Sequence, residues 1–212
     1  MTDTGIDDYI LSHIEPEPEH LYRLNRRVNT SLLYTHMCSG HLQGRILKML
    51  TRMINPRKVL ELGTYAGYSA LCIAEGLSRP DATVTTIEID DEMEDFIREA
   101  LDSHPSGKRV NLIIGDALKL LPEMDADFDM IYIDANKRHY CDYYRLLIDR
   151  IPHGTFIIAD NTLWGGKVTD PEHNHDPQTR GILEFNDFVA ADSRVETVIV
   201  PLRDGLTLLQ KK

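Results

Sequence analysis

Between residues 58 and 160, five short apolar segments of strand character alternate with four segments of helical character. The strand-like segments are rich in β-branched residues and nearly continuous in apolar character, which is typical of strands buried on both faces. They are KVLEL, TVTTIEI, VNLIIG, FDMIYID and TFIIAD, and the helical segments between them are GYSALCIAEGL, DEMEDFIREAL, ALKLLPEM and HYCDYYRLLIDRI. This alternation predicts an α/β fold with a doubly wound, mostly parallel sheet.

Both ends of the chain extend this plan. Towards the C-terminus, the polar segment PEHNHDPQTRG predicts a loop and ILEFNDFVAAD predicts a helix. The segments VETVIVPL and GLTLLQ are separated only by RDG, so we expect an antiparallel hairpin that brings the sheet to seven strands. Near the N-terminus, LYRLNRRVNTSLLYTH and GRILKMLTRMI have helical spacing, Pro16 and Pro18 break the helical pattern before them, and Asn55-Pro56 ends the last helix.

Length and charge limit the organisation of the chain. With 212 residues, we expect a single domain over 1–212, with an N-terminal helical cover over 1–55 and the α/β core over 56–212. The net charge of −11 disfavours non-specific binding to nucleic acid, because that binding needs cationic surface for phosphates.

The location of the protein in the cell is predicted from three further features of the sequence. No apolar run reaches the roughly 18 residues of a membrane span, and the acidic start MTDTGIDDYI lacks the apolar segment of a secretory signal. Cys38, Cys72 and Cys141 lie far apart and have no metal-ligand spacing, which indicates reduced thiols. We therefore expect a cytoplasmic protein without a membrane partner.

The turn ELGTYAGYS follows the first strand and opens a helix, which is where nucleotide-like ligands bind in open α/β sheets. Gly63 and Gly67 have the spacing of neither the dinucleotide fingerprint nor the phosphate-binding loop. Glu61 would repel a pyrophosphate but could hold an ammonium group, Glu88 could accept ribose hydroxyls, and Asp116 could reach an adenine edge. These features favour S-adenosylmethionine; the alternative is an ordinary glycine turn with acidic helix caps.

Polar residues also end the fourth and fifth strands, in YIDANK and FIIADN. If these strands are neighbours, Asp134, Asp160 and Asn161 converge, and a divalent cation would relieve the repulsion of the carboxylates. Three oxygen ligands with open positions favour Mg²⁺, with Mn²⁺ or Ca²⁺ as alternatives. Lys137 could act as a general base, because a nearby cation lowers the pKa of its ammonium group. The alternative is that both aspartates are strand-end caps and that Lys137 is a surface lysine.

Taken together, the motifs resemble the class I S-adenosylmethionine-dependent O-methyltransferases of the caffeoyl-CoA and catechol type, a Rossmann-like family. The resemblance runs from about Met37 to the end of the chain. The segments that carry it are VLELGTYAGYSA, TIEID, GDALKLLP, FDMIYIDANKRHYCDYY, ADNTLWGG and PLRDGLTLL.

The resemblance implies a role for each matched position, and it implies a homodimer whose N-terminal helices cover the site. The cofactor would lie against Met37, Ser39, Glu61, Gly63, Thr64, Ser69, Glu88, Asp116, Ala117 and Asp134. The metal would be bound by Asp134, Asp160 and Asn161. Asp134 and Lys137 would be catalytic, Lys137 as the base.

The resulting hypothesis is methylation of one hydroxyl of a small aromatic diol of the catechol kind, after both hydroxyls have bound the metal. Trp164, Tyr140, Tyr143 and Tyr144 could shape an aromatic pocket, although core packing is the alternative for the tyrosines. A second hypothesis is a tRNA 5-hydroxyuridine O-methyltransferase, for which RLNRR offers a small basic patch. A third is a non-catalytic protein that only binds the cofactor.

Overall fold

The computed structural model describes residues 4–212, so the first three residues of the expected cover, 1–55, lie outside the described part. Seven strands form one sheet in the order β3-β2-β1-β4-β5-β7-β6. β1 to β5 are parallel, and β7 runs antiparallel to both β5 and β6. The predicted seven-stranded, mostly parallel sheet with an antiparallel C-terminal hairpin is confirmed. The strands are β1 (Lys58–Leu62), β2 (Thr83–Glu88), β3 (Val110–Ile114), β4 (Met130–Ile133), β5 (Phe156–Asp160), β6 (Val195–Val200) and β7 (Leu206–Lys211).

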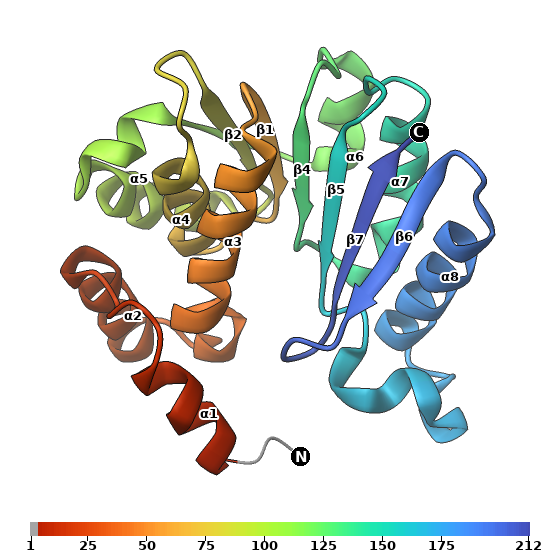
Figure 1. Ribbon diagram of the computed structural model, residues 1–212, viewed down its shortest axis with the longest axis horizontal. Helices are drawn as coiled ribbons and strands as arrows, with labels where there is room; N and C mark the ends of the chain where they lie inside the picture. The colour runs from red at the N-terminus through yellow and green to blue at the C-terminus, as the bar shows by residue number, and fades with distance from the viewer. Residues whose placement is uncertain (1–3) are drawn as a thin grey trace.

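Helices cover both faces of the sheet (Figure 1). The α-helices are α1 (Thr4–Ser12), α2 (Glu19–Ser31), α3 (Gly40–Ile54), α4 (Tyr68–Gly76), α5 (Glu94–Asp102), α6 (Ala117–Leu120), α7 (Tyr140–Ile148) and α8 (Pro177–Ala191). Short 3-10 helices include η1 (Thr35–Met37), η5 (Lys137–His139) and η6 (Trp164–Thr169). None of the helices in residues 4–212 is long and apolar enough to cross a membrane.

The core divides according to the alternation of side chains along the strands. Leu60, Ile131 and Ile157 pack towards α7 and α8, whereas their neighbours Met130 and Ile158 pack towards α3 and α4. Strands buried on both faces explain why their sequences are nearly continuous apolar runs.

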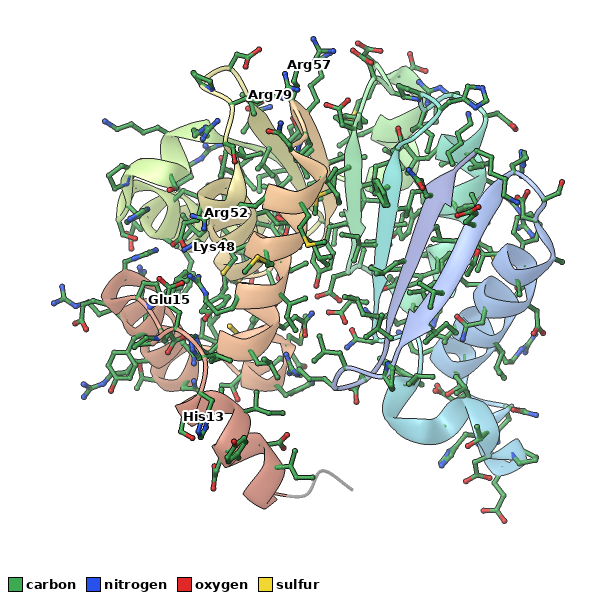
Figure 2. The ribbon with its side chains drawn as sticks, viewed as in Figure 1. His13, Glu15, Lys48, Arg52, Arg57 and Arg79 are labelled. Atoms are coloured by element: carbon green, nitrogen blue, oxygen red, sulfur yellow. The ribbon has the colours of Figure 1, made fainter. Side chains whose placement is uncertain are left out.

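The parallel strands all end at the lower edge in Figure 1, towards which α1, α2 and η6 also lie. Arg57, directly before β1, and Arg79, in the connection to β2, lie at the opposite edge (Figure 2). Side chains that follow the strands therefore share one edge, and these two exposed arginines lie away from it.

Two helix boundaries differ from the sequence prediction. The helix that was expected to reach residue 36 ends at Ser31, and Leu32 has an extended backbone before η1 begins. The expected loop 171–181 contains the first turn of α8, because Asp176 accepts hydrogen bonds from the backbone N–H groups of Gln178 and Thr179 and Pro177 occupies the first turn.

Candidate active site

Two glycines shape the turn between β1 and α4. Gly63 has a φ of +91°, and a Cβ atom there would collide with the backbone carbonyl of Asp134. Gly67 has a φ of +82° and caps α4. Both positions thus need glycine for the backbone itself, and Gly63 also lets the first turn approach the end of β4.

Glu61 is a fully buried carboxyl at this edge of the sheet. The Thr86 hydroxyl donates to Oε2 at 2.6 Å, but Oε1 has no hydrogen-bond partner among the described residues. Burial raises the pKa of Glu61 to about 7, a net value in which the hydroxyls of Ser69 and Thr86 lower the pKa and the charges of Asp134 and Glu88 raise it slightly. A buried acceptor without a donor suits a ligand that brings a cationic N–H group.

Glu88, at the end of β2, holds the turn in place. Its Oε2 accepts the backbone N–H groups of Thr64 at 3.1 Å and Tyr65 at 2.7 Å, and Oε1 accepts that of Asp90 at 3.0 Å. Oε1 keeps a free lone pair, so it can still accept a hydroxyl hydrogen.

The remaining predicted cofactor residues lie on several elements. Thr64 and Ser69 are buried in the first turn and in α4, Ser39 is buried just before α3, and Met37 is half-exposed at the end of η1. Asp116 follows β3 and caps α6 by accepting the Leu118 N–H at 3.0 Å, with Ala117 buried beside it. Asp116 is therefore a helix cap, as the alternative interpretation of this residue expected.

The ends of β4 and β5 bring the two predicted metal-binding aspartates together. Ile133 pairs with Ala159 across parallel strands, so the next residues, Asp134 and Asp160, lie side by side at one strand spacing, about 5 Å. Burial, together with a smaller contribution from the charge of Asp134, raises the pKa of Asp160 to about 6. Two carboxylates this close repel each other unless a positive charge lies beside them, which the Lys137 ammonium or a divalent cation would supply.

Asn161 completes the donor set at the end of β5. Its φ of 58° places it in the left-handed region, which asparagine tolerates better than most residues. Its backbone N–H donates to Asp160 Oδ1 at 2.8 Å, and no hydrogen bond of its side-chain amide is found within residues 4–212. Two carboxylates and a free amide oxygen fit a hard divalent cation.

Lys137 is held inside the site rather than on the surface. Its side chain is buried, and Nζ lies 2.7 Å from Asp134 Oδ1 and 2.7 Å from the Tyr140 hydroxyl. The Tyr140 oxygen in turn lies 3.0 Å from the Asp160 carbonyl and 3.1 Å from that of Ile133. A buried lysine fixed beside a carboxylate is placed to exchange a proton with a ligand bound there.

The model of the O-methyltransferase family matches residues 12–212. The chain belongs to this family. It is 30% identical to a caffeoyl-CoA O-methyltransferase of Stellaria longipes, over all of this chain and 94% of the relative. The O-methyltransferase TomG of Streptomyces achromogenes, solved with S-adenosylmethionine, has a TM-score of 0.90, 29% identity and complete coverage of both chains. An O-methyltransferase of Bacillus cereus, solved with S-adenosylhomocysteine, has a TM-score of 0.88 and 28% identity, over 98% of this chain and 97% of that one.

The predicted family, the class I S-adenosylmethionine-dependent O-methyltransferases, is thus confirmed. In this O-methyltransferase, the three tyrosines that were considered for an aromatic pocket lie in the hydrophobic core instead. Tyr140, Tyr143 and Tyr144 are buried in the core beside α8, which makes core packing the correct interpretation. Tyr140 nonetheless serves the site through its hydroxyl.

Sequence reasoning missed four residues that support the site. Gln43 and Tyr132 both donate to Asp160 Oδ2, and Arg203 contacts Gln43. Gly181 lets α8 pack against the backbone of Lys137, which a Cβ atom would hit. None of the four left a signal, because Gly181 stands in the segment expected to be a loop and becomes a helix residue only in the structure.

A second group of possible metal ligands lies elsewhere in the O-methyltransferase, where atoms of His20, Glu75 and His104 lie within 4.8 Å of one another. The two imidazole rings are stacked at 3.8 Å, so their lone pairs cannot converge on one ion. Arg45 and Lys48 already lie 3.3 and 3.2 Å from Glu75 Oε2. The group is therefore an ion-pair cluster that fastens α2 to α3 and α4.

Proposed function

We propose that this O-methyltransferase transfers the methyl group of S-adenosylmethionine to one hydroxyl of a catechol-like aromatic diol, with a divalent metal ion bound in the site. The observation that carries the proposal is the juxtaposition of Asp134 and Asp160 at neighbouring strand ends, with Lys137 at 2.7 Å from the first of them. Support for the cofactor comes from the bound structures of the relatives and from the unpaired buried oxygen of Glu61.

Asp134, Asp160 and Asn161 would hold Mg²⁺, with Mn²⁺ or Ca²⁺ as alternatives. When bound, such an ion supplies Lewis acidity that brings a phenol, with an ordinary pKa of about 10, within reach of ionisation at neutral pH. Lys137, as the neutral amine, accepts the phenol proton and becomes an ammonium beside Asp134, and the hydrogen bond from Nζ to Tyr140 fixes the position of that nitrogen. Because Asp160 and Lys137 are buried, water is largely kept from the reacting groups, and alignment of donor and acceptor supplies much of the acceleration.

A small phenolic acceptor is favoured by the relatives, which include caffeoyl-CoA O-methyltransferases. The tRNA alternative is weakened by the net charge of −11. It is weakened further because two arginines of the basic segment RLNRR are already paired with carboxylates, Arg23 with Glu19 and Arg27 with Glu99. A non-catalytic role is disfavoured because Asp134, Lys137 and Asp160 are all present and close together.

We also propose that the chain is a single domain over 1–212, in which residues 1–55 form a helical cover and residues 56–212 form the α/β core. A cytoplasmic location is supported by the spacing of the three cysteines, which are buried free thiols. A homodimer is supported by exposed apolar side chains on β6 and α3.

A methyl-transfer assay tests the proposal. Labelled S-adenosylmethionine is offered with catechol, caffeic acid, a monophenol, unmodified tRNA and hydroxyuridine-bearing tRNA, each with EDTA and with added Mg²⁺ or Mn²⁺. We expect label in the two diols only, loss of transfer in EDTA, and recovery when metal is restored.

Methyl transfer to hydroxyuridine-bearing tRNA but to neither diol would show that the acceptor is tRNA and not a small aromatic diol. Methyl transfer that persists in EDTA after metal removal would refute the proposed dependence on a metal ion. The variant Asp160→Ala should lose turnover but bind S-adenosylmethionine as the wild type does, because Asp160 is assigned to the metal and not to the cofactor.

A further inference from the structure

Gln43 of α3 is a buried amide, 2% exposed, whose side chain joins three distant parts of the chain. Its Nε2 donates to the Tyr132 hydroxyl of β4 at 2.9 Å and to Asp160 Oδ2 at the end of β5. Its Oε1 accepts from Arg203 Nη1 at 2.9 Å, in the turn between β6 and β7. Both ends of the amide are thus used, which is the usual condition for burying such a group.

The chemistry of the partners fixes the orientation of this amide. A guanidinium only donates, and an ionised carboxylate only accepts. Arg203 therefore requires the amide oxygen on its side, and Asp160 requires the NH₂ group on the other. A flipped Gln43 would set its oxygen against the Asp160 carboxylate and its NH₂ against Arg203, so only one orientation is stable.

The consequence for Asp160 is an unequal use of its two oxygens. Oδ2 accepts two donors, Gln43 Nε2 and the Tyr132 hydroxyl at 2.8 Å. Within residues 4–212, Oδ1 accepts only the backbone N–H of Asn161, at 2.8 Å. Since each carboxylate oxygen offers about two acceptor positions, Oδ2 is saturated and Oδ1 keeps one free.

We propose that Gln43 and Arg203 are positioning residues that hold Asp160 as a ligand through Oδ1 alone, by way of the hydrogen-bonded chain Arg203–Gln43–Asp160. The inference rests on the proposed metal-dependent function. Partners of this kind orient metal-binding carboxylates in other proteins, and their loss typically weakens metal affinity about 10- to 100-fold.

Arg203 has a second task that separates it from Gln43. Its Nη1 also donates to the backbone carbonyl of Ser39, in the segment proposed to contact the cofactor. Arg203 therefore links the cofactor segment to the metal ligand, whereas the side-chain hydrogen bonds of Gln43 in the described part of the chain reach only Tyr132, Asp160 and Arg203. Loss of Arg203 should affect both ligands, and loss of Gln43 should affect only the metal.

The test measures binding rather than turnover. Mn²⁺ affinity is measured by electron paramagnetic resonance and S-adenosylmethionine affinity by calorimetry, for wild type, Gln43→Leu, Arg203→Met and the double variant. We expect Gln43→Leu to bind Mn²⁺ about 10- to 100-fold more weakly and S-adenosylmethionine unchanged. Arg203→Met should weaken both ligands, and in the Gln43→Leu background it should weaken Mn²⁺ no further, because residues that act in one chain are non-additive.

Gln178→Leu on α8 is the matched control, since it makes the same change outside the chain of contacts and should bind both ligands as wild type. A folded Gln43→Leu with wild-type Mn²⁺ affinity and only a lower melting temperature would reduce Gln43 to a structural role and overturn the inference. If Gln43→Leu does not fold, unchanged Mn²⁺ affinity in Arg203→Met would overturn it instead. A wild type that binds no Mn²⁺ would defeat the proposed function as well, which separates the two failures.

Discussion

At the scale of single residues, Glu61 makes the stability of the cofactor-free protein depend on pH. Its pKa is raised from 4.5 to about 7 by burial, so the folded protein holds this proton more tightly than the unfolded chain does. The neutral form is favoured below pH 4.5, and stability falls as the pH rises from there to about 7. Above pH 7, the ionisation of buried Glu61 lowers the free energy of unfolding by about 3 kcal/mol in full.

Glu61→Gln removes that cost and keeps an acceptor for the Thr86 hydroxyl. We expect the free energy of unfolding of this variant, relative to wild type, to rise between pH 5 and pH 8 by up to about 3 kcal/mol. Urea unfolding of both cofactor-free proteins at several pH values measures the difference. A difference that stays constant over this range would mean that Glu61 is already ionised when folded.

How far single residues could be predicted depends on the range of their contacts. Asp134, Asp160 and Asn161 were predictable because strand ends in a parallel sheet share an edge and the acids stand directly after apolar runs. Gln43 and Arg203 were not, because Gln43 of α3 reaches Asp160 of β5 over 117 residues of sequence, and Arg203 of the β6–β7 turn reaches Gln43 over 160. No local pattern in LQGR or LRDG records such a contact.

At the scale of elements, α8 and η5 pack so closely that one glycine decides their distance. A Cβ atom at Gly181 would lie 2.7 Å from Arg138 Cα and would also meet the backbone of Lys137. Helix propensity alone predicts that Gly181→Ala stabilises α8 by about 1 kcal/mol. Overpacking against backbone costs about 1–3 kcal/mol, so we expect a net loss of stability.

Activity should fall with stability in Gly181→Ala, because η5 begins with Lys137. Thermal unfolding and methyl transfer are measured together, with Asp187→Ala, an exposed change on the same helix, as the control. A melting temperature at or above that of wild type would show that propensity outweighs packing here.

Element boundaries were less predictable than the elements themselves. β1 occupies the residues expected for it because KVLEL is bounded on both sides by turn residues. α8 begins five residues before the expected helix, since Asp176 and Pro177 start a helix inside a segment whose polar composition resembles a loop. The capping pair was visible in the sequence, but the apolar period that identifies a helix begins only after it.

At the scale of the whole molecule, none of the helices in residues 4–212 covers one face of the last two strands of the sheet. Val198, which is 55% exposed, and Val200 lie on β6 and pair with Leu208 and Leu206 of β7. They lie on the side of the sheet on which α3 packs against other strands. In Figure 1 no helix lies in front of β6 and β7.

A second copy of this chain is the occupant that the proposed homodimer assigns to this face. Burying the valines against a copy is favourable at roughly 25 cal/mol per Å², whereas a buried unpaired charge costs several kcal/mol. Val198→Lys should therefore convert a dimer to a monomer in light scattering coupled to size exclusion. Tyr22→Lys on α2, a similarly exposed side chain, should leave the mass unchanged. A wild type that is monomeric at high concentration, or a dimer that survives Val198→Lys, would exclude this face as the contact.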